Sequence, residues 1–293
     1  IDTTCDALED NQIDWDCIFG PDSLEEVHQR GGKFTTCRKT NSRHPCSRFI
    51  VKKDQERSEV KVQEGPDGFP FLKGEKYVFS YSFRAVEGMK LSNRFTHLGQ
   101  LKGSKGGYMI HGDPIYSLTA NDDGLMVRFS NKESIDDFHS GFEKPLSWKD
   151  STGQWVHVKI TTVFGESMEV ELSGAVSGKA VWPQNLKPVA WHKDAEMVRM
   201  KLGLYHKTNE VADGEVEFRN IVIKGPNGTI RTSSRAEPSG SLYRGCFEDQ
   251  VKNRVLQKAK YVDGKMTPEL CEDLCEGSEY FGVEYSTEVL RSK

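Results

Sequence analysis

Apolar and polar residues alternate with a period of two along most of the chain, a pattern typical of half-buried β-strands. Residues 76–86 (KYVFSYSFRAV) place Tyr77, Phe79, Tyr81 and Phe83 on one face, opposite mostly polar or small side chains. The same alternation is found in segments 124–130, 155–164, 168–174 and 215–224. The sequence therefore predicts a series of short strands through the middle of the chain.

Turn signals separate these segments, at Asp122-Asp123-Gly124, Phe164-Gly165 and Pro226-Asn227-Gly228. Segment 215–224 slips in phase near Asn220. Amphipathic helices are scarce before residue 265, although residues 22–30 (DSLEEVHQR) are a candidate for a short one. Many short strands with little helix predict an all-β fold: a β-jelly roll or concanavalin-like sandwich of two antiparallel sheets.

A linker is expected at residues 231–241 (RTSSRAEPSGS), because this stretch is small and polar and contains Pro and Gly. It would separate a β-jelly-roll domain at residues 1–230, which includes a disulfide-stapled segment at 1–49, from a small cysteine-rich fragment at 242–293. At about fifty residues, that fragment is too small to fold without cross-links.

Composition and charge narrow the class of protein. The 293 residues are 36% hydrophobic, which suits a protein with a core. No apolar run approaches the roughly 20 residues of a membrane helix. The chain starts at Ile1 without signal-peptide features, so we expect a signal peptide to have been removed or never to have existed. A net charge of −4 argues against nucleic acid as a partner, so an anionic ligand would need a local cluster of cations.

The seven cysteines fall into two groups, four near the N-terminus and three near the C-terminus. No CxxC pair with zinc-site spacing is present. We expect two disulfides among Cys5, Cys17, Cys37 and Cys46. Their connectivity is open, with Cys5–Cys17 and Cys37–Cys46 as the most local choice. Disulfides and an N-glycosylation sequon at Asn227 predict a secreted, extracellular protein.

Three predicted strands carry charged or polar side chains on one face. The aligned residues are Arg57, Glu59 and Lys61 in segment 56–62 (ERSEVKV), Gln100 and Lys102 in segment 95–103 (FTHLGQLKG), and Arg199, Lys201 and Tyr205 in segment 198–207 (VRMKLGLYHK). Strict alternation places His97 on the face opposite to Gln100. Such faces arise on ordinary exposed sheets, where Arg57 and Glu59 would form a weak ion pair. The alternative is a site that holds an anion close to a tyrosine.

An R-x-E strand, a Q-x-(K or H) strand and a K-x-G-x-Y strand, in this order, resemble the secreted jelly-roll polysaccharide lyases. Alginate lyases and fungal glucuronan lyases are the nearest comparisons, and the resemblance covers roughly residues 50–225. It implies β-elimination on a polyuronate, with Gln100 and Arg57 neutralising the uronate carboxylate. Tyr205 would remove the C5 proton, protonate the departing O4, or do both. The cations Lys201 and Arg199 would lower the pKa of Tyr205.

Many alginate lyases carry a histidine two residues after this glutamine, where the present chain has Lys102. Tyr205 would then carry more of the proton transfer. Elimination requires no cofactor, and the expected partner of a monomeric chain is an acidic polysaccharide, with no membrane involved. Substrate-binding residues are expected to be Lys102, Lys201, Arg199, Glu59, Lys207 and His97. Candidate oxygen ligands of a structural Ca²⁺ are Asp213, Glu217 and Asn220.

Two other functions compete with the lyase hypothesis. Glu169 and Glu171 share a strand face, and closely spaced carboxylates are typical of retaining glycoside hydrolases acting on β-glucan. The full Glu, Asp and Glu pattern of such glucanases on a single strand is absent. A lectin-like module would bind polysaccharide without ever releasing an unsaturated product.

The C-terminal fragment resembles the first half of a WSC domain, a cysteine-rich module that binds carbohydrate. The matching features are Gly245-Cys246 near its start, Cys271 and Cys275 on a helix that opens at Thr267-Pro268, and residues 280–285 (YFGVEY). The family normally continues with further cysteines. We therefore expect a truncated unit with one unpaired cysteine and weak order after about residue 240. The resemblance implies binding to cell-wall polysaccharide.

Overall fold

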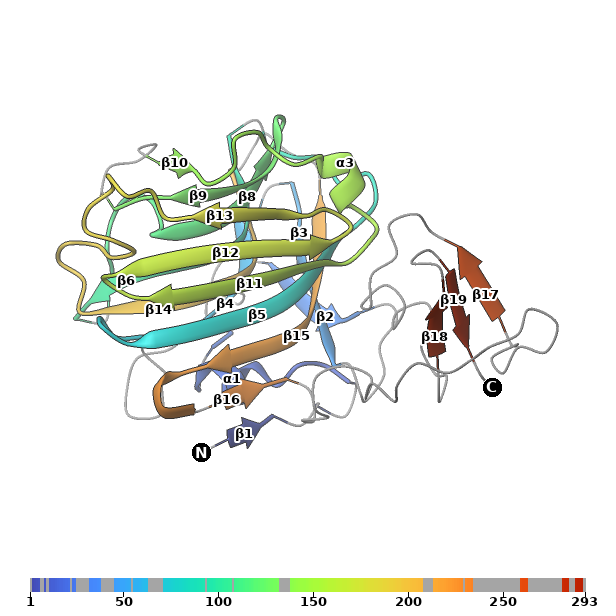
Figure 1. The fold of residues 1–293 in the computed structure, drawn as a ribbon, viewed down its shortest axis with the longest axis horizontal. Coiled ribbons are helices and arrows are strands. Elements are labelled where there is room, and N and C mark those ends of the chain that lie inside the picture. Colours follow the sequence, from blue (N-terminus) through green and yellow to red (C-terminus); the bar gives the residue numbers. More distant parts are fainter. Residues whose placement is uncertain are drawn as a thin grey trace. The chain divides into compact units, whose positions relative to one another are not determined.

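The computed structural model describes residues 2–5, 8, 11–21, 23–24, 32–37, 45–53, 55–62, 71–92, 94–106, 108–131, 138–207, 213–228, 230–233, 259–262, 281–284 and 288–291. The chain divides into a large unit, residues 1–235, and a small unit, residues 236–293. The large unit is a sandwich of two β-sheets (Figure 1).

Nine strands form the first sheet, in the order β1-β16-β15-β5-β11-β12-β13, with β3 paired to β15 and β2 paired to β3. Their bounds are β1 (Asp2–Thr4), β2 (Lys33–Thr36), β3 (Cys46–Val51), β5 (Lys76–Ala85), β11 (Val156–Val163), β12 (Ser167–Gly174), β13 (Gly178–Val181), β15 (Gly214–Lys224) and β16 (Ile230–Thr232). These strands pair antiparallel, except that β1 runs parallel to β16.

Seven strands form the second sheet, in the order β10-β9-β8-β6-β14-β4, with β7 paired to β6. Their bounds are β4 (Arg57–Lys61), β6 (Thr96–Lys105), β7 (Tyr108–Met109), β8 (Tyr116–Asn121), β9 (Gly124–Phe129), β10 (His139–Ser140) and β14 (Met197–His206). The described helices of this unit are short: α1 (Trp15–Phe19), α3 (Trp148–Ser151) and the 3-10 turn η1 (Pro226–Gly228).

The chain crosses repeatedly between the two sheets. Strands β3, β5 and β15 belong to the first sheet, whereas β4, β6 and β14 belong to the second. The predicted fold class, an all-β sandwich of two antiparallel sheets, is confirmed. The predicted short helix at 22–30 lies largely outside the described residues.

The apolar faces of the strands meet between the sheets. Tyr77, Phe79, Tyr81 and Phe83 of β5 are at most 2% exposed. On the facing sheet, the even-numbered apolar residues of β14 from Val198 to Leu204 are at most 1% exposed. The two-residue alternation in the sequence therefore predicted correctly which face of these strands turns into the core.

The phase slip predicted near Asn220 is a β-bulge in β15. The pairing of β15 with β5 shifts between Arg219 and Val222. Asn220 has a φ of 55°, a left-handed conformation that asparagine adopts more readily than most residues. The bulge lets β15 keep apolar side chains on the core face on both sides of the slip.

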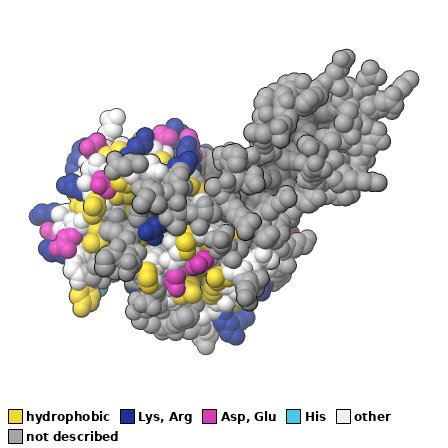
Figure 2. Space-filling model, turned by 90° about the horizontal axis from the view of Figure 1, so that it is seen from below, with side chains coloured by type: hydrophobic (Ala, Val, Ile, Leu, Met, Phe, Trp, Pro, Cys, Tyr) yellow, Lys and Arg dark blue, Asp and Glu magenta, His cyan; other side chains and the backbone are white. Residues whose placement is uncertain are grey.

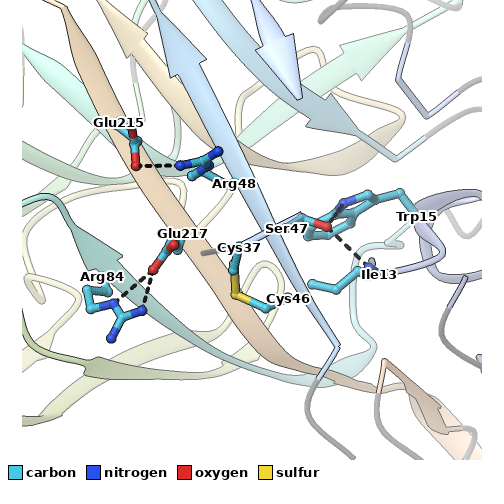
Figure 3. The surroundings of a disulfide bond; sticks show 9 residues. All are labelled: Ile13, Trp15, Cys37, Cys46, Ser47, Arg48, Arg84, Glu215 and Glu217. Carbon is cyan, nitrogen blue, oxygen red and sulfur yellow. Dashed lines mark hydrogen bonds and ion pairs between the residues drawn. A yellow bond between two sulfur atoms is a disulfide. The ribbon is translucent and has the colours of Figure 1, made fainter. Parts of the chain in front are cut away.

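The N-terminal segment is fastened to the first sheet by disulfides and a buried polar contact. Disulfides join Cys5 to Cys17 and Cys37 to Cys46, the most local of the pairings considered. Close to the second bond, the indole Nε1 of Trp15 donates a hydrogen bond of 3.1 Å to the Ser47 hydroxyl (Figure 3). Trp15 also packs edge-on against Phe49, so this segment extends the hydrophobic core.

The predicted linker starts too early. Residues 230–232 form β16, which pairs with both β1 and β15. The amide of Ser233 then donates to the carbonyl of Ile221 at 2.9 Å. Residues 231–233 therefore belong to the sandwich, because their backbone groups complete its edge.

The described part of the small unit is a three-stranded antiparallel sheet in the order β17-β19-β18. Its strands are β17 (Ala259–Val262), β18 (Phe281–Glu284) and β19 (Glu288–Arg291). The helix predicted around Cys271 and Cys275 lies outside the described residues. So does most of the segment after residue 240 for which weak order was expected.

Acidic and basic side chains are interspersed over the described surface seen in Figure 2. This mixture agrees with the small net charge of −4. In the part of the chain that the structure describes, no helix has the length and apolar character needed to cross a membrane.

Candidate active site

The three segments singled out in the sequence are adjacent strands of the second sheet, in the order β6-β14-β4. Tyr205 in β14 lies opposite Arg57 in β4 and opposite His97 in β6. Further along the same strands, Lys201 lies opposite Gln100. The face of β4, β6 and β14 that points away from the core is called the polar face below; it consists of Arg57, Glu59, His97, Gln100, Lys102, Arg199, Lys201 and Tyr205.

A second β-bulge corrects the predicted orientation of His97. The pairing of β6 shifts between His97 and Gly99, so β6 contains one extra residue at this point. Leu98 is fully buried in the core, and Gly99 turns toward the core as well, because a Cβ on it would meet the Tyr81 hydroxyl at 2.5 Å. Alternation is therefore broken, and His97 lies on the same face as Gln100.

Gly203 lets β14 approach β4 closely at the centre of the polar face. Its φ is +143°, and a Cβ at this position would lie 2.3 Å from the carbonyl oxygen of Ser58 and 2.7 Å from the Cα of Glu59. Both are backbone atoms, which cannot rotate away. The K-x-G-x-Y pattern therefore needs glycine for steric reasons.

Gly203→Ala is expected to lower the free energy of unfolding by about 2–4 kcal/mol, because it combines backbone strain with a backbone clash. Chemical denaturation monitored by tryptophan fluorescence measures this change. Gly88→Ala is the matched control, since Gly88 also has a positive φ, +72°, but has nothing within 4 Å of a Cβ. Equal losses in the two variants would contradict a close approach of β14 to β4.

Tyr205 lies between a cation and two rings. The guanidinium carbon of Arg57 is 3.9 Å from the centre of the tyrosine ring. The Phe95 and His97 rings are 5.0 Å and 5.6 Å from it, centre to centre. Together these groups restrict the orientation of the phenol. Tyr205 is thus held in place by Arg57, Phe95 and His97.

The predicted pKa shift of Tyr205 is wrong in direction. Burial raises the pKa of Tyr205 above its ordinary value, and Arg57 only partly offsets this effect. Glu56 and Glu59 add to the rise. The cation close to the ring is Arg57, whereas Lys201 and Arg199 lie further along β14. The phenol is therefore protonated at neutral pH and suited to donate a proton.

Glu59 connects the other two residues assigned to catalysis. Its carboxylate is fully buried, accepts a hydrogen bond of 2.6 Å from the Gln100 amide nitrogen, and lies 3.6 Å from the guanidinium of Arg57. Contacts thus run without interruption from Gln100 through Glu59 and Arg57 to Tyr205. Both contacts hold Glu59 between Gln100 and Arg57 within the sheet.

Glu59→Ala is expected to destabilise the protein by about 3 kcal/mol, because it removes the buried partner of Arg57. Urea unfolding measures the loss. Glu171→Ala is the control, since the Glu171 side chain is 42% exposed and pairs with lysines at the surface; its loss is expected to stay within about 0.5 kcal/mol. Equal effects would show that the buried carboxylate does not hold the site together.

Lys102 lies at the other end of the polar face, opposite Arg199. Its ammonium group donates a hydrogen bond of 2.7 Å to the carbonyl of Gly112. Burial, together with Lys201 and Arg57, lowers the pKa of Lys102 to about 8. The fully buried His192 is close by, and burial and Lys102 lower its pKa to about 4.

Other predicted residues lie away from the polar face. Asp213 pairs with Lys52 at 2.6 Å. Glu217 pairs with Arg84 at 2.6 Å on the first sheet (Figure 3). Within the described ranges, no three His, Cys, Asp or Glu side chains are grouped so that they could hold a metal ion. Asn220 lies at the β15 bulge. The proposed ligands are therefore not gathered into a Ca²⁺ site.

The carboxylates of the hydrolase alternative are also elsewhere. Glu169 and Glu171 lie on β12 of the first sheet and pair with Lys179 at 2.8 and 3.8 Å. They belong to a surface ladder of ion pairs. Lys207, predicted to bind substrate, is an exposed residue just after β14. The predicted glycan at Asn227 falls on a side chain outside the described set.

The sequence did not predict the orientation of His97 or the position of Arg128 near Gln100. Strict alternation placed His97 on the wrong face, and only the pair Leu98-Gly99, an apolar residue before a glycine, hinted at a bulge. Arg128 of β9 lies opposite Ser117 of β8, which in turn lies opposite Gln100. Segment 124–130 showed the alternation but gave no reason to connect Arg128 with this site.

Comparison with known proteins identifies the small unit. Residues 243–290 match the family model of the WSC domain, which confirms the prediction of a WSC-like unit. A WSC domain-containing protein from Arthroderma benhamiae is 47% identical over 49 residues, which are 17% of this chain and 7% of that protein. The chain therefore matches only a small part of this curated relative.

Several solved structures similar to the chain are polysaccharide lyases. Alginate lyase A1-II′, a member of polysaccharide lyase family 7, is 13% identical, with a TM-score of 0.48 over 64% of this chain and 86% of that one. The endo-β-1,4-glucuronan lyase of Trichoderma reesei is 14% identical, with a TM-score of 0.45 over 66% and 86%. The alginate lyase of Klebsiella pneumoniae is 8% identical, with a TM-score of 0.47 over 66% and 84%. Identities this low describe a likeness of fold alone.

Proposed function

We propose that this chain is a polysaccharide lyase that cleaves a β-linked polyuronate by β-elimination, with glucuronan as the first substrate and alginate as the second. The observation that carries the proposal is the uninterrupted contact from Gln100 through Glu59 and Arg57 to Tyr205. A group that can neutralise a carboxylate is thereby linked to a group that can move a proton.

Elimination from a uronate is limited by the acidity of the C5 proton. The adjacent carboxylate carries negative charge, and removing the proton adds more charge to the same group. The Arg57 guanidinium and the second N–H of the Gln100 amide would stabilise this enolate-like transition state by charge and hydrogen bonding. The first amide N–H is engaged by Glu59, which fixes the orientation of the amide.

Proton transfer completes the reaction. Loss of the C5 proton and departure of O4 leave a double bond between C4 and C5, and O4 must receive a proton. Tyr205 is assigned to this transfer as base, acid or both, and its raised pKa favours the acid role. Lys102, Lys201 and Arg199 would bind other carboxylates of the chain.

Two further features favour an extracellular polysaccharide substrate. The disulfides Cys5–Cys17 and Cys37–Cys46 suit an oxidising compartment, so we propose that the protein is secreted. The WSC match at residues 243–290 suggests a second point of attachment to carbohydrate, such as cell-wall polysaccharide.

Incubation of the full chain with glucuronan, alginate and neutral β-glucans tests the proposal. The expected result is a rise in ultraviolet absorbance from the new C4–C5 double bond with at least one uronate, and none with neutral glucans. New reducing ends without this absorbance would indicate a hydrolase. Binding without either signal would indicate a lectin-like module.

A further inference from the structure

We propose that Arg128 binds the carboxylate of a second uronate, near the one that is cleaved, and so selects polysaccharides whose acidic sugars are contiguous. This inference rests on the lyase function proposed above. It narrows the substrate class to homopolyuronates, as opposed to polysaccharides in which uronates alternate with neutral sugars.

A row of side chains connects the polar face to Arg128 across four neighbouring strands. Residues that lie directly opposite each other on adjacent strands point to the same side of a sheet. The row consists of Lys201 in β14, Gln100 in β6, Ser117 in β8 and Arg128 in β9. Val127 and Phe129, which flank Arg128, are fully buried in the core, so Arg128 points away from the core. Arg128 therefore extends the polar face toward the far edge of the second sheet.

Exposure divides this row into a floor and an edge. Gln100, Lys201 and Ser117 are at most 4% exposed, and they form the floor. Arg128 is half-buried, as is Arg57 on the other side of Gln100. A ligand that lies over Gln100 can therefore reach one guanidinium group on each side.

The two arginines suit carboxylates of different sugars. Strands β14, β6 and β8 lie between β4, which carries Arg57, and β9, which carries Arg128. Neighbouring strands are about 4.8 Å apart, so β4 and β9 are separated by about 19 Å across the sheet. Arg57 and Arg128 would thus approach a bound polysaccharide from opposite sides of Gln100.

The Arg128 guanidinium is oriented by its neighbours. Its carbon lies 3.8 Å from the centre of the Phe138 ring, and its Nε donates a hydrogen bond of 3.2 Å to the Met126 sulfur. A guanidinium stacked on a ring keeps N–H donors at its edge, where they can pair with a carboxylate. Burial and the positive charge of Arg128 lower the pKa of His97 to about 3, so this charge acts on the site.

A second bound carboxylate changes which polysaccharide is preferred. Where uronates alternate with neutral sugars, the sugar next to the cleaved residue has no charge, and Arg128 gains no ion pair with the substrate. Where uronates are contiguous, both guanidinium groups gain a charge-assisted hydrogen bond. The arrangement therefore favours uninterrupted runs of uronate.

The first test compares variants of the full chain on the uronate that the wild type cleaves. Arg128→Gln should raise KM about tenfold with little change in kcat, because it removes a hydrogen bond between charged groups. Arg128→Lys keeps the charge and should recover part of this loss. Arg219→Gln is the matched control, since Arg219 also stacks on a ring, Trp155 at 4.1 Å, but lies on β15 of the first sheet; it should keep the wild-type KM.

The second test uses the same uronate after a known fraction of its carboxylates has been reduced to alcohols. For the wild type, kcat/KM should fall more steeply than in proportion to the carboxylates that remain, because two neighbouring charges must be present together. For Arg128→Gln the fall should be less steep, because one of these charges no longer contributes.

Each outcome supports or overturns the assignment. A loss of kcat without a change in KM, equal losses in Arg128→Gln and Arg219→Gln, or equal steepness in the wild type and Arg128→Gln would overturn it. If Arg128→Gln fails to fold, the wild type decides: a fall in simple proportion to the remaining carboxylates contradicts the proposal, and a steeper fall supports it. A wild type that releases no unsaturated product would instead refute the lyase function itself.

Discussion

Tyr205→Phe is expected to lower kcat by about 10³-fold and to leave KM and the unfolding midpoint nearly unchanged. The substitution removes the hydroxyl that protonates O4 but keeps the ring that packs against Arg57, Phe95 and His97. General acid–base groups typically contribute about 10²–10⁴-fold to a rate. Steady-state assays of double-bond formation measure the effect.

Tyr108→Phe is the matched control for this substitution. Tyr108 is 81% exposed, lies in β7 and is not one of the residues of the polar face, so the variant should keep wild-type activity. If Tyr205→Phe were also fully active, another residue would have to protonate O4. The assignment of Tyr205 would then be wrong.

Gln100→Ala is expected to lower kcat by about 10²–10³-fold while KM changes little. The amide donates to the charge that develops on the carboxylate in the transition state, and removal of one such donor typically has an effect of this size. Loss of the amide also leaves Glu59 without its partner at 2.6 Å, so some loss of stability should accompany the loss of rate.

Ser117→Ala is the control for Gln100→Ala. Ser117 faces Gln100 across the β6–β8 pairing and is equally buried, at 2% exposed, yet it has no assigned role in the reaction. It should retain most of the activity. If Gln100→Ala changed KM alone, the amide would contribute to ground-state binding and not to the transition state.

The sequence predicts the faces of the site correctly where the strands are regular. In β4 and β14 every second residue turns away from the core, so Arg57, Lys201 and Tyr205 were correctly predicted to share a face. The prediction failed for His97, where one extra residue in β6 reverses the alternation. At this bulge Gly99 lies close to Tyr81 of the other sheet, a residue distant in sequence.

The predicted direction of the Tyr205 pKa shift was wrong for a related reason. The sequence showed cations near Tyr205 along the same strand, but it did not show how far the ring is buried. The Tyr205 ring packs against Phe95, just before β6, and against His97 of β6. The desolvation of the phenol then outweighs the positive charge of Arg57.

The sequence by itself determined the all-β sandwich, the inward face of most strands, the N-terminal disulfide segment and the WSC-like unit. These features depend on local periodicity and on the residue types of short segments, which can be recognised without knowing the partners. Only the tertiary structure decided that β4, β14 and β6 are neighbours, that Glu59 connects Gln100 to Arg57, and that His97 faces Tyr205. Strand order, bulges and burial arise from packing between distant segments, which no local pattern records.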